Sequence, residues 1–458
     1  MGNLLRPASI AAALLALAGI AARPGAALAV ASQSTIQPVL GITDVVQTYG
    51  MIQDIGTVDM FAGTFAPGGS LVANGQLLSI SQNQVLFSQI GTSYGGNGTN
   101  TFALPDLDGR IAVGTGQGGG LSYRTLGQGF GSDTITLSQP QIPLANGGFG
   151  QPISNTQPSL PLTFSIATRG VFPTPNGPVA GSIANPLVGE VFISAAPLAN
   201  GNLVQLNGAT LNIAQNQALF SLLGTTYGGN GVNTFQLPNA DGRTIIGAGS
   251  GPGLTPRALG ATLGSETTTL TSANLPGPYG SGTPYSNMQP SLALHYMIAV
   301  AGLFPTQSGL GLDASEPLLG QIALFAGATA PNGWLFADGQ TLSIAQNQAL
   351  FAVLGTTYGG NGVSTFDLPD FDGRGAIGAD DGSGLNGLSG FSLGQDFGTE
   401  TLQLTSAELP VLPSRNAVPE PASFFVLLAG LLLCGRGRQA VFRVAQMVQG
   451  IRKKIRIF

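Results

Sequence analysis

The sequence predicts a β-rich α+β fold built from three tandem modules, each with one short capped helix and several short strands. A block ending in Asp-Gly-Arg recurs three times in register, at residues 79–110, 212–243 and 343–374. Glycine accounts for 70 of the 458 residues, and charged side chains for only 8%, against about a quarter in ordinary soluble domains. Because the copies lie a domain length apart, they indicate whole modules rather than short solenoid repeats.

Each block opens with a predicted helix of about three turns. A serine or asparagine starts it, with a glutamine three residues later, which is the pattern of a capping box. In the third copy the helix turns Ile344, Leu350, Phe351 and Leu354 toward a core. A glycine then ends the helix, since glycine adopts the left-handed conformation at little cost. The cap pairs are Ser79 with Gln82, Asn212 with Gln215 and Ser343 with Gln346, and the closing glycines are Gly91, Gly224 and Gly355.

A glycine-rich loop follows each helix and begins with Tyr94, Tyr227 or Tyr358. The Tyr-Gly-Gly-Asn-Gly run is too rich in glycine for a helix or strand, so a shaped loop is predicted. If these tyrosines are exposed, they are candidate ligand contacts that stack on a sugar or a partner. If they are buried, they pin the loop to the module. The segment after the loop is predicted to be a short strand ended by proline, at Pro105, Pro238 and Pro369.

The repeated segment resembles the phage tail collar domain, in the form seen in bacterial microcystin-dependent-type proteins. The residues that carry the resemblance include the 343–374 block, Gly320-Gln321-Ile322 before it, and closing segments such as Gln157-Pro158-Ser159-Leu160 and Gln289-Pro290-Ser291-Leu292. The resemblance implies modules at 30–173, 187–305 and 319–413. The third module is shortened, because it lacks the closing Gln-Pro-x-Leu segment. Collar domains of phage fibres assemble as trimers, so three modules in one chain suggest an imitation of that assembly within a monomer.

Residues 1–29 are predicted to be a secretory signal peptide. Arg6 is the only charge before an apolar stretch. Ala27-Leu28-Ala29 is a small-residue cleavage site that marks Ala27 and Ala29, with Ala29-Val30-Ala31 as the alternative. The alternative is a buried N-terminal helix, but no partner pattern follows it. Signal peptidase is therefore an expected partner, and the body is expected outside the cytoplasm.

The C-terminal segment, residues 417–458, resembles a PEP-CTERM sorting signal. Pro419, Glu420 and Pro421 precede the apolar run Phe424–Cys434, and arginines follow it. The resemblance implies cleavage by an exosortase-type enzyme and export linked to exopolysaccharide. As a helix the apolar run spans about 16 Å, half of a ~30 Å hydrocarbon core, so it predicts a transient inner-membrane anchor. The extension after Arg438 is basic and amphipathic. The alternative for the whole tail is an ordinary buried helix with a charged end.

The body between these two segments is acidic. Nine of the 16 basic residues and one of the 21 acidic residues lie in the terminal segments, which leaves 7 basic against 20 acidic side chains, a net charge of −13. Such a charge disfavours nucleic acid and anionic lipid as partners and suits solubility outside the cell. Cys434, the single cysteine, lies in the tail, so the body can hold no internal disulfide.

No catalytic residue or cofactor site is predicted. His295, the only histidine, lies in a predicted strand and is expected to be structural. Asp106, Asp108, Asp370 and Asp372 are weak Ca²⁺ candidates, because the paired carboxylates offer oxygen ligands. The alternative is a turn in which aspartate caps backbone N–H groups and the closing arginine pairs with a carboxylate.

These observations predict an exported structural or binding protein of the cell envelope or extracellular matrix, associated with polysaccharide. One alternative is an enzyme that acts on surface glycans, although no carboxylate pair is singled out for it. A second alternative is a phage-derived tail fibre or receptor-binding component. The two terminal segments count against that alternative, because phage fibres assemble in the cytoplasm.

Overall fold

The fold is described from a computed structural model that covers residues 33–48, 55–143, 151–182, 185–196, 201–307, 316–379, 388 and 390–409. The predicted signal peptide and sorting tail lie outside the described residues, so the predictions made for them stay predictions. Within the described ranges, no helix has the length and apolar character needed to cross a membrane.

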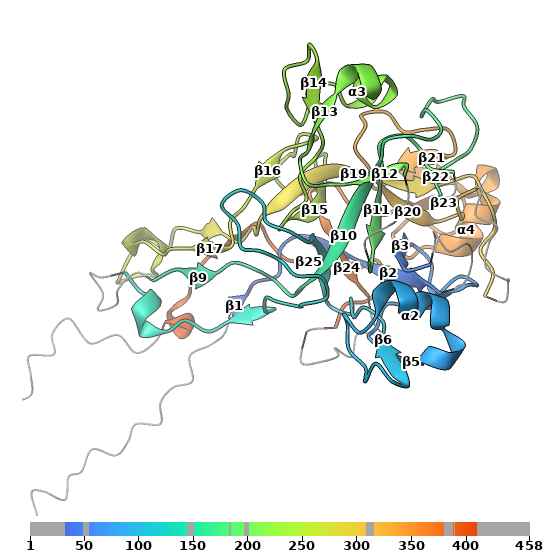
Figure 1. Cartoon of the computed structure of the whole chain (residues 1–458). Coiled ribbons are helices and arrows are strands. Elements are labelled where there is room, and N and C mark those ends of the chain that lie inside the picture. Colours follow the sequence, from blue (N-terminus) through green and yellow to red (C-terminus); the bar gives the residue numbers. More distant parts are fainter. Residues whose placement is uncertain are drawn as a thin grey trace, which may run out of the picture. The chain divides into compact units, whose positions relative to one another are not determined.

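Three repeats of the same elements follow one another along the chain, which confirms the predicted β-rich α+β class (Figure 1). Repeat 1 comprises β3 (Thr57–Phe61), β4 (Ser70–Val72), β5 (Leu77–Ser79), η1 (Ile80–Gln82), α2 (Gln84–Ile90), β6 (Thr101–Ala103), β7 (Ile111–Gly114), β8 (Thr134–Ile135), η2 (Gln139–Gln141), β9 (Ile153–Ser154) and β10 (Ser159–Ala167). Repeat 2 comprises β11 (Glu190–Ser194), β12 (Leu203–Gln205), β13 (Thr210–Asn212), η4 (Ile213–Gln215), α3 (Gln217–Leu223), β14 (Thr234–Gln236), β15 (Thr244–Gly247), β16 (Thr262–Leu263), β17 (Thr267–Thr268), η5 (Ser272–Asn274), β18 (Tyr285–Ser286) and β19 (Ser291–Ala299).

Within the described residues, repeat 3 ends at Leu409 and shows no counterpart of the long strand that ends the other two. It comprises β20 (Gln321–Phe325), β21 (Trp334–Phe336), β22 (Thr341–Ser343), η6 (Ile344–Gln346), α4 (Gln348–Leu354), β23 (Thr365–Asp367), β24 (Gly375–Gly378), β25 (Asp396–Phe397), β26 (Thr401–Leu402) and η7 (Ser406–Glu408). Two N-terminal strands precede repeat 1, namely β1 (Gln33–Ser34) and β2 (Val39–Gln47).

The long strands β10 and β19 each bridge two repeats. The first half of β10 pairs in parallel with β7 of its own repeat, and its second half pairs antiparallel with β11 and β12 of repeat 2. Strand β19 makes the equivalent pairings. It pairs in parallel with β15 of its own repeat, and antiparallel with β20 and β21 of repeat 3. All nine residues of β10 are buried, as expected of a strand covered on both faces.

The N-terminal strand β2 takes, beside repeat 3, the position that β10 and β19 take beside repeats 1 and 2. Its first half pairs in parallel with β24 of repeat 3, and its second half pairs antiparallel with β3 and β4 of repeat 1. Residues 37–40 read Gln-Pro-Val-Leu, which is the missing Gln-Pro-x-Leu segment. The lead-in to repeat 1 therefore completes repeat 3 as well, and the three repeats close into a ring.

The first strands of the three repeats meet at the centre of this ring. The start of β3 pairs with the end of β11, the start of β11 with the end of β20, and the start of β20 with the end of β3. One hydrophobic core runs through all three repeats and includes Phe102, Phe235 and Phe366 at equivalent positions. The repeats are thus parts of one cooperative body, and the sheet crosses the module boundaries that the sequence suggested.

The predicted capping boxes at the helix starts are wrong. Residues 80–82 form a separate 3₁₀ turn, and helix α2 begins after Asn83 as a helix of 7 residues. The Ser79 side chain caps no backbone group and instead lies 2.9 Å from the Ser81 hydroxyl. In repeat 2, Asn212 accepts from the Ala214 N–H, but the reciprocal half of the box is not formed. The glycine stops are confirmed at equivalent positions with positive φ, at Gly91, Gly224 and Gly355.

Capping boxes do occur elsewhere in each repeat, at short 3₁₀ turns that the sequence analysis did not single out. In each, the backbone N–H and the hydroxyl of the first residue donate to the side-chain oxygen of the residue three positions later, as in Ser138 with Gln141, Thr271 with Asn274 and Thr405 with Glu408. The strands predicted before the prolines are confirmed as β6, β14 and β23, which pair with β5, β13 and β22.

Candidate functional site

The three loop tyrosines lie at the contacts between repeats. The Tyr94 hydroxyl donates to the Ala195 carbonyl of repeat 2 over 2.7 Å. The equivalent bonds join Tyr227 to Ala326 over 2.8 Å and Tyr358 to Ala62 over 3.0 Å. The loop of each repeat is therefore hydrogen-bonded to the next repeat. The third of these hydrogen bonds joins repeat 3 to repeat 1 and closes the ring.

Burial raises the pKa of all three tyrosine hydroxyls well above its usual value. They stay protonated, and therefore remain donors, across the physiological range. The hydroxyls are engaged with a neighbouring repeat rather than with the tyrosine's own module. Stacking of these rings on an external ligand stays a prediction.

The loop after each tyrosine is held in shape by one asparagine. In repeat 1 the Asn97 side-chain oxygen accepts from the N–H groups of Thr99, Asn100 and Thr101 at 2.8–3.0 Å. Asn230 and Asn361 do the same in repeats 2 and 3. Gly96, with φ of 92°, allows the close return of the loop, because a Cβ there would lie 2.4 Å from the Cα of Phe102.

We call residues 79–101, 212–234 and 343–365 the helix–loop blocks. None of the three contains an acidic residue, a basic residue or a histidine. Their outer surface is formed mainly by amides, hydroxyls and glycines, together with exposed alanines and with Val85, Val232 and Val363, which are 44%, 84% and 87% exposed. In an acidic body, these blocks form uncharged, preshaped surfaces.

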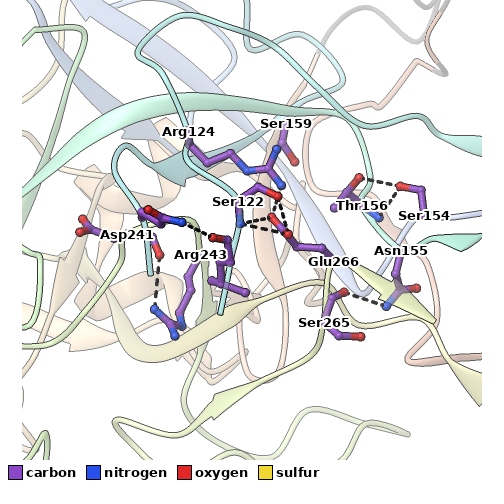
Figure 2. Close-up of polar contacts among 12 residues, drawn as sticks. Ser122, Arg124, Ser154, Asn155, Thr156, Ser159, Asp241, Arg243, Ser265 and Glu266 are labelled. Atoms are coloured by element: carbon purple, nitrogen blue, oxygen red, sulfur yellow. Dashed lines mark hydrogen bonds and ion pairs between the residues drawn. The ribbon is translucent and has the colours of Figure 1, made fainter. Parts of the chain in front are cut away.

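The first joint, between repeats 1 and 2, contains a partly buried ion pair. Arg124 binds Glu266, whose carboxylate also accepts from the backbone and hydroxyl of Ser122 (Figure 2). The guanidinium of Arg124 also lies 3.6 Å from the centre of the Phe130 ring. Nearby, the Asn155 side chain donates to the Ser265 carbonyl across the same joint (Figure 2).

The second joint, between repeats 2 and 3, repeats this arrangement. Arg257 binds Glu400, and that carboxylate accepts from the backbone and hydroxyl of Thr255. The Asn287 side chain donates to the carbonyls of Ile36 and Thr399. The sequence analysis missed both ion pairs, because nothing in the local sequence relates charges that lie more than a module apart.

The closing joint, between repeats 3 and 1, is apolar where the other two are charged. Phe391 takes the position of Arg124 and Arg257, is 1% exposed, and meets Phe397 edge to face with ring centres 4.9 Å apart. It packs in a cluster with Ile36, Val39, Ile111 and Ile377. Strand β2 is thus held to repeat 3 by hydrophobic contacts in addition to its backbone pairing with β24 and β25.

Two buried carboxyls lie near the centre of the ring. Burial, with a smaller effect of Asp108, raises the pKa of Asp44 on β2 to about 8. Burial also raises the pKa of Glu190 to about 8, although its carboxylate accepts the Leu187 N–H over 2.9 Å. Asp44 lines a central cavity with Thr244. At the positions equivalent to Asp44, β10 and β19 carry the aromatic residues Phe164 and Tyr296.

The weak Ca²⁺ candidates are engaged within the protein. Asp106 binds Arg110 over 2.5 Å, and Asp370 binds Arg374 over 2.9 Å. Asp372 accepts from the Ser250 N–H of repeat 2 over 2.8 Å, and Asp108 is 6% exposed. The described residues hold no group of three or more His, Cys, Asp or Glu placed to bind a metal ion.

His295 has structural partners. Its Nδ1 lies 2.9 Å from the Gly327 carbonyl, and its ring stacks on Phe336 with centres 4.2 Å apart. It lies on β19, as the sequence predicted, and contacts repeat 3.

A ring of like repeats joined by bridging strands defines a repeat-built protein. Three segments, residues 56–112, 189–245 and 320–376, match the family model described as Phage Tail Collar Domain. The chain therefore carries three tandem collar domains, and domains of this kind indicate a phage-tail-like structural role. Each match runs from the first strand of a repeat through its helix–loop block to the strand after the Asp-Gly-Arg turn. No curated protein and no solved structure shows significant similarity to the chain.

Proposed function

We propose that this protein is an exported structural and binding component of the cell envelope or extracellular matrix, associated with polysaccharide. The observation that carries the proposal is ring closure by β2, which completes three collar domains within one chain. A body that is closed in this way needs no second chain to pair and bury its strands. A self-contained body of this kind, acidic and without cysteine, suits a protein that works outside the cytoplasm.

The ring predicts that the body is a monomer in solution. A single chain already supplies the three repeats that separate chains supply in a symmetric trimer. Light scattering on the purified protein is expected to give the mass of one chain. A mass of three chains would contradict the proposal that the repeats replace a trimer.

Export is tested by the mass of the protein recovered from the culture. We expect loss of residues 1–29 through signal peptidase and loss of the tail near Pro419-Glu420-Pro421 through an exosortase-type enzyme. The full-length chain, uncut and soluble inside the cell, would contradict export.

The alternative function for an exported protein of this kind is an enzyme that acts on glycans. Incubation of the protein with polysaccharides separates the two, because an enzyme releases reducing ends and a binding protein retains the polymer unchanged. The phage-derived tail component remains the second alternative, and recovery of the protein from phage particles would favour it.

A further inference from the structure

We propose that the three helix–loop blocks form the surface that binds polysaccharide, and that the polymer they bind is an uncharged one. This inference rests on the proposed function and adds to it the face of the protein and the chemical class of the glycan.

The first argument is charge. The body between the terminal segments carries a net charge of −13, which repels acidic polymers at close range. The helix–loop blocks are long stretches without any charged side chain, so they offer no counter-charge to an ionic polymer, whereas a neutral polymer requires none. The carboxylates of the described residues lie outside the blocks, in the turns, strands and joints, as at Asp106, Glu190 and Glu266. One of them, Asp367 on β23, borders the third loop beside Gly359.

The second argument is hydrogen-bonding capacity. Gln84, Gln217 and Gln348 are exposed first residues of the three helices and occupy equivalent positions. The helix–loop surfaces around them expose further amides and hydroxyls, including Gln82, Thr92 and Asn100 in repeat 1. Amides both donate and accept, which matches the hydroxyl groups of a neutral sugar. Binding loops that adapt to polar partners have a similar Ser, Gly and Asn content.

The third argument is preorganisation. Each loop is fixed by three hydrogen bonds to one asparagine oxygen and by a tyrosine bonded to the next repeat. A loop that is already ordered loses little conformational entropy on binding. Three equivalent surfaces on one chain can also engage successive parts of one long polymer, so weak single contacts add up to useful avidity.

The test compares retention of the purified full-length chain on a neutral glucan, dextran, and on an acidic polymer, alginate. The wild-type chain is expected to be retained by dextran, to bind alginate at least tenfold more weakly, and to keep its dextran retention between low salt and roughly 0.5 M salt. The triple variant Gln84→Glu, Gln217→Glu and Gln348→Glu is expected to lose dextran retention by about tenfold or more. Its fold is expected to persist, because glutamate is favourable in the first turn of a helix.

The matched control adds the same three charges elsewhere. Thr136, Thr269 and Gln403 are exposed and lie at equivalent positions outside the helix–loop blocks. The variant Thr136→Glu, Thr269→Glu and Gln403→Glu is expected to keep wild-type retention. Equal loss in both triple variants, or no loss in either, would overturn the assignment of this surface. Circular dichroism and thermal unfolding of both variants show whether a loss reflects binding rather than folding.

The outcomes also separate this inference from the proposed function. Retention on alginate but not on dextran overturns the neutral-polymer inference and leaves association with polysaccharide standing. Retention on neither polymer removes the support for both. Retention on dextran that only the helix–loop variant loses supports both.

Discussion

The first joint and the closing joint bring together equivalent strands that carry different side chains. Between repeats 1 and 2, Arg124 binds Glu266 and lies over Phe130. Between repeats 3 and 1, Phe391 replaces the arginine and packs against Phe397 in an apolar cluster. The backbone pairings are the same in both, so the ring symmetry is a property of the backbone, while each joint is stabilised by its own chemistry.

The difference between the two joints corresponds to how the chain connects the repeats that each joint brings together. Strands β10 and β19 are covalently continuous with both repeats that they join, which keeps the partners at high effective concentration. Strand β2 continues into repeat 1 but reaches repeat 3 only through contacts. An apolar cluster gains free energy from burial without paying to desolvate charges. The closing joint therefore uses the interaction that best holds a strand whose link to repeat 3 is not covalent.

The largest expected effect comes from removing the closing strand. Deletion of residues 30–47 leaves β24 and β3 without a shared partner, and we expect loss of the cooperative thermal transition or a fall of more than about 10 °C in its midpoint. A synthetic peptide of residues 33–48 is expected to restore the transition by strand addition. The same peptide with Ile42→Asp is the control, because Ile42 is fully buried. An unchanged midpoint after the deletion would contradict ring closure by β2.

The buried carboxyl of the closing strand gives the next effect. The Asp44 pKa is about 8 in the folded protein and 3.8 in its ordinary state. The protonated Asp44 carboxyl therefore makes its full contribution to the stability of the fold below pH 4. This contribution is lost as the pH rises to 8. The expected change is about 1.4 kcal/mol in the free energy of unfolding for each pH unit in that window.

Urea unfolding at pH 5 and pH 8 measures this dependence. Asp44→Asn is expected to reduce the change in the free energy of unfolding between pH 5 and pH 8 by roughly 4 kcal/mol. The remaining slope is expected to fall further with Glu190→Gln, since Glu190 has a similarly raised pKa. An identical slope in wild type and Asp44→Asn would show that Asp44 is not buried as described.

Exchange of the joint chemistry is expected to have a smaller effect. Arg124→Ala leaves the Glu266 carboxylate without its main partner, and we expect a loss of about 2 kcal/mol. Phe391→Arg places a guanidinium in the apolar cluster beside Val39 and is expected to cost at least as much. Chemical denaturation with urea compares the two. A stabilised Phe391→Arg variant would show that the closing joint accepts the chemistry of the first joint.

The smallest effect is expected from the tyrosine hydroxyls. Tyr94→Phe removes one hydrogen bond to the next repeat, with an expected loss of about 1 kcal/mol. Tyr358→Phe removes the equivalent bond at the closing joint and is the matched comparison. Similar losses of unfolding free energy in the urea experiment indicate that the three tyrosine hydrogen bonds are equivalent. No loss in any of them would mean that the hydroxyl bonds to Ala195 and Ala62 are not maintained in solution.

Much of the local structure was predictable because its signals are local. The helix ends at Gly91, Gly224 and Gly355, and the strands before Pro105, Pro238 and Pro369, depend on residues close in the chain. The helix starts were mispredicted, although Ser79 and Gln82 have the right spacing. A 3₁₀ turn at residues 80–82 moves the α-helix to Gln84, and the serine hydroxyl bonds to a neighbouring serine instead.

The sequence by itself determined that three like modules of low charge follow one another, because a repeated pattern is visible without any structure. It also contained the Gln-Pro-Val-Leu segment at residues 37–40 that completes the third module. Only the tertiary structure decided that this segment bridges the first and last repeats. It alone showed that Tyr358 fastens to Ala62 and that Phe391 replaces an ion pair. The physical reason is that strand pairing and burial join residues hundreds of positions apart, and no local propensity encodes such partners.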